Sequence, residues 1–172
     1  VITFIIGNNE NLIINAKEEI SSPARGMIVI EGNTNTILYG KNEHEQMPMA
    51  STTKIVTAIL AIENCNNLDE KIEISSKAVG IEGTSIYIKE GEVLTLMDLL
   101  YGLMLRSGND AALAIANYVG GSVDGFVSLM NKKAKELNMT NTTFNNPSGL
   151  DQDKGNYSTA YDMALLTSYA MK

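Results

Sequence analysis

The stretch Met49-Ala-Ser-Thr-Thr-Lys54 leads into an apolar run from Ile55 to Ile62 and decides the fold around it. It places a serine hydroxyl and a lysine amine three residues apart, where a buried helix is predicted to start. Residues at i and i+3 share a helix face, so we expect the Lys54 amine beside the Ser51 oxygen. A serine is a weak nucleophile until a base takes its proton, and a desolvated lysine can be that base. The pattern therefore predicts a serine nucleophile activated by a lysine.

A second polar motif, Ser107-Gly-Asn109, interrupts a predicted helix about 55 residues after the first. A turn of this kind can present a hydroxyl and a carboxamide towards a neighbouring helix end, and its glycine permits a tight turn. Each motif alone is a weak signal, because most such serines are helix caps or surface residues and such glycines are helix breaks. Two of them in one chain indicate a catalytic site more strongly than either does.

Composition narrows the function classes. The chain has 172 residues and 44% hydrophobic residues, enough for one domain with a substantial core. Its formal net charge is −7 with no long run of like charges, so neither nucleic acid nor an anionic membrane surface is an expected partner. Cys65 is the only cysteine, which excludes an internal disulfide and a Cys/His zinc spacing. The only histidine, His44, is expected in a solvated turn rather than in a Ser-His-Asp triad.

Hydrophobic patterning predicts an α+β fold with two early strands followed mostly by helices. Two strands alone leave open sheet edges, so this pair requires further strands. Val1–Ile6 is predicted to be an N-terminal strand, with the tail of a cleaved secretory signal as the alternative. The predicted strands or extended pieces are 26–31, 37–40, 71–74 and 85–88. The predicted helices start at Ser51, at Thr95 with a capping box to Asp98, at Asp110 as a cap, at Phe126 (to Leu137) and at Thr159 (to Met171).

Five blocks in this order resemble the penicillin-binding, active-site-serine family, and specifically its low-molecular-mass D-alanyl-D-alanine carboxypeptidases. The resemblance covers roughly residues 24–172. The blocks are Ala24-Arg-Gly-Met-Ile-Val-Ile30 with Ile37-Leu-Tyr39, Met49-Ala-Ser-Thr-Thr-Lys-Ile-Val-Thr-Ala58, Leu100-Tyr-Gly-Leu-Met-Leu-Arg-Ser-Gly-Asn-Asp-Ala-Ala112, Thr143-Phe-Asn-Asn-Pro-Ser-Gly-Leu-Asp151 and Tyr157-Ser-Thr-Ala-Tyr-Asp-Met-Ala164.

The resemblance implies a role for each motif residue. Ser51 would be the acylated nucleophile, with its backbone amide as half of the oxyanion hole, and Lys54 its general base. Ser107 would relay a proton towards the leaving amine, and Asn109 would hold the substrate's amide. The implied fold is a transpeptidase-like helical cluster packed on an antiparallel sheet, and neither a metal nor an organic cofactor is implied.

The resemblance also implies the substrate and its location. The enzyme would trim peptidoglycan stem peptides ending in D-Ala-D-Ala and would be acylated by β-lactams. Peptidoglycan lies outside the cytoplasmic membrane, so an extracytoplasmic location is expected, although no membrane anchor is visible in the sequence.

One departure from the family is serious. The third family motif, Lys-Thr-Gly or Lys-Ser-Gly on a sheet strand, does not occur in the sequence. We therefore expect 1–23 to be an N-terminal extension and 24–172 a partial catalytic domain that lacks its C-terminal strands and has impaired activity by itself. Loss of one oxyanion donor typically costs about 10²–10³ in rate.

Two alternatives remain open at this point. A β-lactamase of the same superfamily would require fast deacylation, which in class A depends on a well-placed glutamate. The only glutamate after Asn109 is Glu136, which is expected on a solvated helix face. A catalytically inactive module that binds cell-wall peptide is favoured by the missing third motif and disfavoured by retention of both other motifs.

Overall fold

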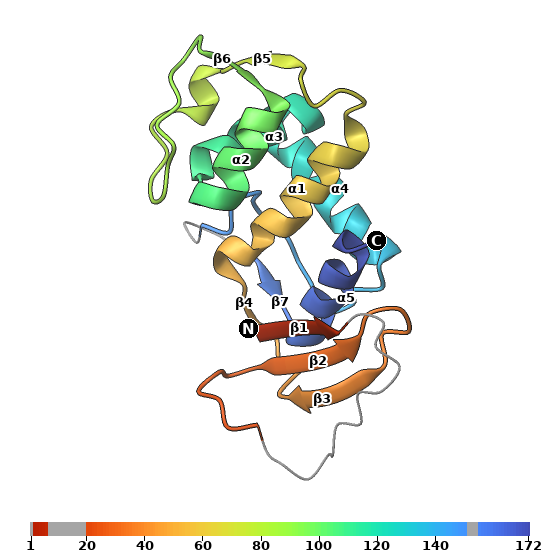
Figure 1. Cartoon of the computed structure of the whole chain (residues 1–172). Helices are drawn as coiled ribbons and strands as arrows, with labels where there is room; N and C mark the ends of the chain where they lie inside the picture. The colour runs from red at the N-terminus through yellow and green to blue at the C-terminus, as the bar shows by residue number, and fades with distance from the viewer. Residues whose placement is uncertain (1, 7–19, 151–154) are drawn as a thin grey trace. The chain divides into compact units, whose positions relative to one another are not determined.

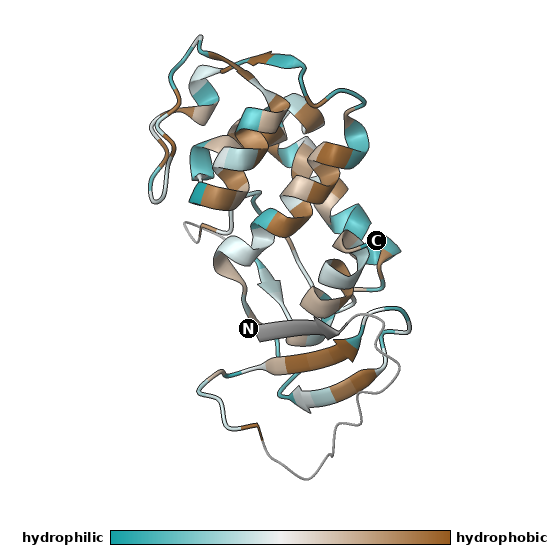
Figure 2. Ribbon diagram, viewed as in Figure 1, coloured by the Kyte–Doolittle hydropathy of each residue, from teal (hydrophilic) through white to brown (hydrophobic). Residues whose placement is uncertain are grey.

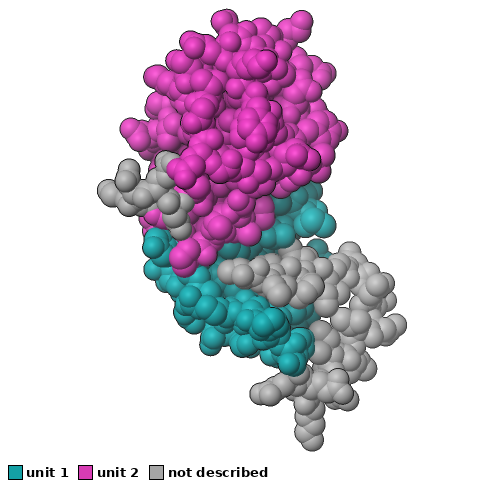
Figure 3. All heavy atoms as spheres, turned by 90° about the vertical axis from the view of Figure 1, so that its left-hand side faces the viewer, with its two compact units in different colours: residues 1–47, 134–142, 157–172 teal, residues 48–133, 143–156 magenta. Residues whose placement is uncertain are grey.

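The computed structural model describes residues 2–6, 20–150 and 155–172. The chain divides into two compact units (Figure 3). The sheet unit comprises residues 1–47, 134–142 and 157–172, and the helical unit comprises residues 48–133 and 143–156. All four predicted site residues belong to the helical unit.

A three-stranded sheet forms the centre of the sheet unit. Strand β2 (Met27–Glu31) lies in the middle, with β1 (Ile2–Ile6) parallel on one side and β3 (Ile37–Lys41) antiparallel on the other (Figure 1). Both predicted early strands and the strand at the N-terminus are confirmed. The early pair was expected to require a further strand, and on the β2 side β1 supplies the backbone partners.

Helix α5 (Ala160–Ala170) covers this sheet by packing on β1 and β2. Ala160 and Ala164 lie fully buried against the isoleucines of β2. Small residues on the helix allow this close packing of helix on strand. The helix starts where the sequence predicts, because Thr159 caps it by accepting a hydrogen bond from the Asp162 N–H.

Three helices, α1 (Lys54–Asn64), α2 (Leu96–Arg106) and α3 (Asn109–Gly120), pack against one another in the helical unit (Figure 1). Apolar residues lie along all three, as the brown segments of Figure 2 show. Leu60, Leu99 and Ile115 are among the buried side chains of these helices. The Thr95–Asp98 capping box that was predicted to start α2 is present.

Shorter elements complete the chain, and the α+β fold class is confirmed. The predicted extended piece at 85–88 is not a strand; β5 pairs antiparallel with β6 instead. The predicted helix at 126–137 is α4 (Val123–Glu136), which begins three residues earlier.

Among the described residues no single helix is long and apolar enough to cross a membrane, and α3 and α4 reach that length only together, across an 85° bend. The remaining elements are β4 (Met47–Pro48), η1 (Ala50–Thr53), β5 (Lys71–Glu73), η2 (Ser76–Ala78), β6 (Val93–Thr95), α4 (Val123–Glu136) and β7 (Tyr157–Ser158).

Candidate active site

Ser51 lies in a short 3₁₀ helix, η1, and not in the first turn of an α-helix as predicted. The α-helix α1 begins at Lys54. In a 3₁₀ turn the side chains at i and i+3 eclipse each other, which brings serine and lysine together more closely than an α-helix does. Lys54 Nζ accordingly lies 3.2 Å from Ser51 Oγ. The predicted pairing of the two side chains is present, by a different local geometry.

The amine of Lys54 is buried among neutral groups. The residue is only 3% exposed, and Nζ donates hydrogen bonds of 2.8 Å to Asn109 Oδ1 and 2.8 Å to the Ser148 carbonyl oxygen. In the described part of the chain no carboxylate forms an ion pair with it. Burial lowers the pKa of Lys54 from 10.5 to about 8. A fraction of this lysine is therefore a neutral amine near physiological pH.

The hydrogen-bond pattern determines where the lone pair of the neutral amine points. The protonated amine has three N–H donors and meets three acceptors: Ser51 Oγ, Asn109 Oδ1 and the Ser148 carbonyl. Asn109 Oδ1 is an acceptor only, because the other end of that amide donates to the Glu82 carbonyl at 2.9 Å. A carbonyl cannot donate either. After loss of one proton, the lone pair must face the only partner that can donate, the Ser51 hydroxyl.

The second motif turns between α2 and α3 in a way that the sequence did not predict. Ser107 adopts the left-handed conformation, with φ 55°, whereas Gly108 has an ordinary φ of −63°. Glycine is needed at 108 for space, since a Cβ there would lie 2.9 Å from Asp110 Oδ1. Ser107 is half-buried and shares no hydrogen bond with Ser51 or Lys54 among the described residues.

Asp110 is not the helix cap that was predicted, because α3 already begins at Asn109. Its carboxylate, 1% exposed, instead accepts hydrogen bonds from Ser85 Oγ and from the backbone N–H groups of Ile86 and Ile88. Burial alone would raise the pKa of Asp110, but these hydrogen bonds and one from the Ala111 N–H outweigh it and lower the pKa. The carboxylate fixes the 85–88 segment against the start of α3, beside Asn109.

The 145–150 loop contributes a group that the sequence reasoning missed. Its Ser148 carbonyl is one of the three acceptors of Lys54. Asn146 Oδ1 accepts from the N–H groups of Ser148 and Gly149 and so sets the turn that aims this carbonyl. A backbone acceptor leaves no residue-type signal, although Asn-Pro-Ser-Gly is a turn-forming sequence.

A pocket of about 380 Å³ borders the site in the helical unit. Two of its lining residues, Glu82 and Ser148, supply the carbonyls that hold Asn109 and Lys54. The same two residues therefore line the pocket and position side chains of the candidate active site. Its lining residues are Gly80, Ile81, Glu82, Leu113, Val123, Asn146, Pro147, Ser148 and Leu150.

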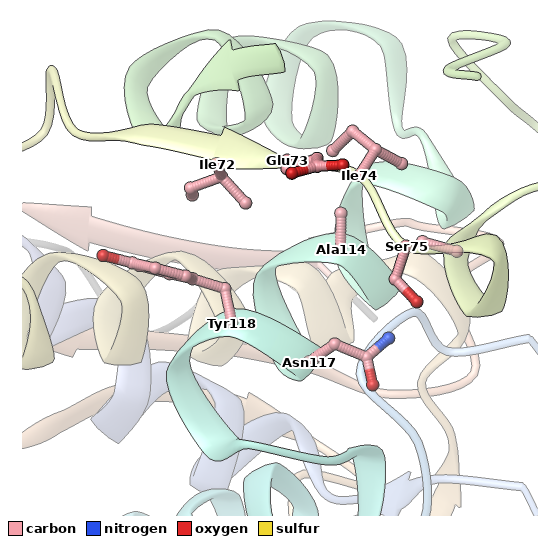
Figure 4. Close-up of a pocket in the computed structure, with 8 residues that line it drawn as sticks. Ile72, Glu73, Ile74, Ser75, Ala114, Asn117 and Tyr118 are labelled. Atoms are coloured by element: carbon pink, nitrogen blue, oxygen red, sulfur yellow. The ribbon is translucent and has the colours of Figure 1, made fainter. Parts of the chain in front are cut away.

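A second pocket, of about 160 Å³, lies between β5 and the C-terminal half of α3 (Figure 4). Its serine, Ser75, caps η2 by accepting from the Lys77 N–H, which is a structural role. Asn117 Nδ2 is buried there without a hydrogen-bond partner among the described residues, and one water molecule would satisfy it.

The remaining candidate groups do not form a second site. Within the described residues no three His, Cys, Asp or Glu side chains are placed to share a metal ion. His44 lies in an exposed turn of the sheet unit, as predicted, with its ring centroid 5.0 Å from that of Tyr161.

Comparison with known proteins places the chain in a family. The family model described as D-alanyl-D-alanine carboxypeptidase matches residues 13–172. The chain is 40% identical over 158 residues to the D-alanyl-D-alanine carboxypeptidase DacF of Bacillus subtilis (strain 168), covering 90% of this chain and 40% of that protein. It is 37% identical over 160 residues to the D-alanyl-D-alanine carboxypeptidase of Streptomyces sp. (strain K15), covering 87% and 55%.

Solved structures give the same result. The crystal structure of the D-alanyl-D-alanine carboxypeptidase DacD from Francisella tularensis superposes with a TM-score of 0.85 at 36% identity, covering 95% of this chain and 40% of that one. Penicillin-Binding Protein D2 from Listeria monocytogenes, in an ampicillin-bound form, gives 0.80 at 31% identity, covering 90% and 64%. The chain spans about 40% of the length of DacF and of DacD from Francisella tularensis.

Proposed function

This chain belongs to the family of D-alanyl-D-alanine carboxypeptidases, and from that membership we propose that it carries the acylation centre of a serine-type carboxypeptidase. Its substrates would be peptidoglycan stem peptides ending in D-Ala-D-Ala, and β-lactams would acylate the same serine. The observation that carries the proposal is the Lys54 amine, buried 3.2 Å from Ser51 Oγ with its pKa lowered to about 8.

In the proposed reaction Ser51 Oγ attacks the carbonyl carbon of the penultimate D-alanine while Lys54 takes the hydroxyl proton. The peptide C–N bond then breaks, and that proton reaches the departing amine of the terminal D-alanine, with Ser107 as the relay. Water hydrolyses the resulting ester and regenerates Ser51. Lys54 suits the first step because its neutral form must turn its lone pair towards the serine.

Asn109 would have two functions in this scheme. Its Oδ1 orients the lysine, and we assign its amide to holding the substrate's backbone. Both fit its position at the first residue of α3, where the Glu82 carbonyl fixes one end of the amide. The Ser51 backbone amide is assigned to the oxyanion hole.

The domain limits and the location follow from the same proposal. Residues 24–172 would form the acylating part of the catalytic domain, and residues 1–23 would form an extension. The proposed substrate would require the protein to act on the outer side of the cytoplasmic membrane.

The proposal is tested by incubating the purified chain with a labelled penicillin and finding the adduct by intact and peptide mass spectrometry. We expect a stable adduct on Ser51 and none in Ser51→Ala. Ser75→Ala is the matched control, because that serine has a capping role in the same unit and its loss should leave the adduct unchanged. A folded wild-type chain without an adduct would contradict the proposal.

A further inference from the structure

We propose that Asn156 is a positioning residue that holds the serine turn and the 145–150 loop in register, so that Ser51 and the Ser148 carbonyl reach Lys54 together. The inference deepens the proposed function and rests on it. Asn156 is 1% exposed, belongs to the helical unit and is not part of either sequence motif.

Asn156 is bonded to the serine turn on both sides of the nucleophile. Its Nδ2 donates to Thr53 Oγ1 at 2.9 Å, and its backbone carbonyl accepts from the Met49 N–H at 3.2 Å. Between these anchors lies Ala50, a non-glycine residue with φ 46°. Such a conformation persists only where the surroundings enforce it. Asn156 supplies part of that enforcement two residues before and two residues after Ser51.

The same side chain fixes the loop. Asn156 Oδ1 accepts from the N–H groups of Asn145 and Asn146 at 2.6 and 3.1 Å, and Nδ2 donates to the Asn146 carbonyl at 2.9 Å. Asn146 in turn orients Ser148 through its own Oδ1. A continuous series of hydrogen bonds therefore runs from Asn156 to the carbonyl that accepts from Lys54.

The 145–150 loop and the serine turn are in direct backbone contact, so their relative position is sensitive to the loss of a hydrogen bond between them. A Cβ on Gly149, where φ is 80°, would lie 1.8 Å from the Ala50 carbonyl oxygen. Without the Asn156 amide, loop and turn would separate and water would enter beside the lysine. The pKa of Lys54 is lowered by burial, so hydration would raise it. A second anchor, Thr57 Oγ1 donating to the Pro147 carbonyl at 2.7 Å, limits the displacement to a partial one.

The test is the pH dependence of Ser51 acylation by a labelled penicillin in the full chain. Asn156→Leu removes the amide at similar volume and adds no charge. We expect the midpoint of the rising limb to move from about 8 towards 9, with a rate about tenfold lower below it, since one pKa unit is tenfold in the neutral amine. Asn131→Leu is the matched control, because Asn131 bonds the residue directly before this loop, donating to the Phe144 carbonyl and accepting from its N–H. It should lower the melting temperature and leave the midpoint in place.

Thr53→Val provides a milder variant that keeps the test valid if Asn156→Leu does not fold. It replaces the Thr53 hydroxyl by a methyl group. The separate variant Thr53→Ser keeps the hydroxyl and should show the wild-type profile. A midpoint unchanged in folded Asn156→Leu and Thr53→Val would overturn the inference while leaving the proposed function intact.

A wild-type chain that is not acylated would contradict the proposed function instead. In that case the ¹³Cε resonance of Lys54, assigned with Lys54→Arg, reports the pKa of the lysine directly in the wild type and both variants. An equal pKa in all three would then overturn the positioning role, and a higher pKa in the two variants would support it.

Discussion

One buried charge lies next to each of the two turns that carry the sequence motifs. The surroundings of the first charge disfavour the charged form, and those of the second stabilise it. Beside the first, the ammonium of Lys54 meets only neutral acceptors, and burial lowers its pKa to about 8, so the charge is easily lost. After the second, the carboxylate of Asp110 accepts hydrogen bonds from a hydroxyl and several backbone N–H groups, which lower its pKa and keep the charge.

The difference separates a chemical role from a structural one. A buried group whose charged form is disfavoured can exchange a proton near neutral pH, as a general base must. A buried group whose charged form is fully hydrogen-bonded acts as a fixed anchor. A lowered pKa does not by itself distinguish the two roles. At Lys54 the lower pKa disfavours the charged form, whereas at Asp110 it favours the charged form.

The largest expected effect comes from removing the exchangeable charge. Lys54→Met should lower the rate of Ser51 acylation by about 10²–10⁴-fold, the usual contribution of a general base. Stopped-flow or mass-spectrometric acylation rates measure it, with Lys77→Met, at an exposed lysine, as the control. The fold should persist, because an apolar side chain of similar length replaces a desolvated charge. An acylation rate within threefold of wild type would show that Lys54 is not the base.

Removing the fixed charge should instead affect stability. Asp110→Asn is expected to cost about 1–3 kcal/mol, because an amide N–H would face the backbone N–H groups that the carboxylate now accepts from. Urea unfolding measures this cost. Asp98→Asn is the matched control: that carboxylate also accepts from a threonine hydroxyl and a backbone N–H, but at an exposed capping box, where a smaller cost is expected. Equal costs for the two variants would contradict the anchor role of Asp110.

The sequence predicted those parts of the molecule that depend on local spacing. The i, i+3 relation of Ser51 and Lys54 holds in the structure, as do the Thr95 and Thr159 helix starts and the β2–β3 pair. Each of these follows from residues within a few positions of one another.

The sequence could not predict contacts made by the folded backbone. Ser148 acts through a carbonyl that every residue possesses, and it lies 94 residues from its partner. The sequence predicted a cap at Asp110, because the groups that donate to its carboxylate, at 85–88, are distant in sequence and form no regular element. The sequence predicted a tight turn permitted by Gly108, but it did not indicate that crowding against Asp110 requires glycine there or that Ser107 takes the left-handed φ.

The last expected effect is the pH dependence of stability, and it distinguishes the two charges by sign. The pKa of Lys54 is about 8 in the folded chain and 10.5 as an isolated group, so the unfolded chain binds more protons between these values. Stability contributed by this group therefore rises with pH from about 8 to 10.5. For Asp110 the folded pKa lies below 3.8, so its contribution is complete above that pH and is lost as pH falls through the folded value.

Paired urea titrations separate these contributions from those of other ionisable groups, which cancel when each variant is subtracted from wild type. The difference between wild type and Lys54→Met should change only on the alkaline side, in favour of wild type as pH rises. The difference between wild type and Asp110→Asn should change only on the acid side, against wild type as pH falls. If the Lys54 difference stayed flat from pH 8 to 10.5, the lysine would have its ordinary pKa in the folded chain, and the contrast between an exchangeable and a fixed charge would be lost.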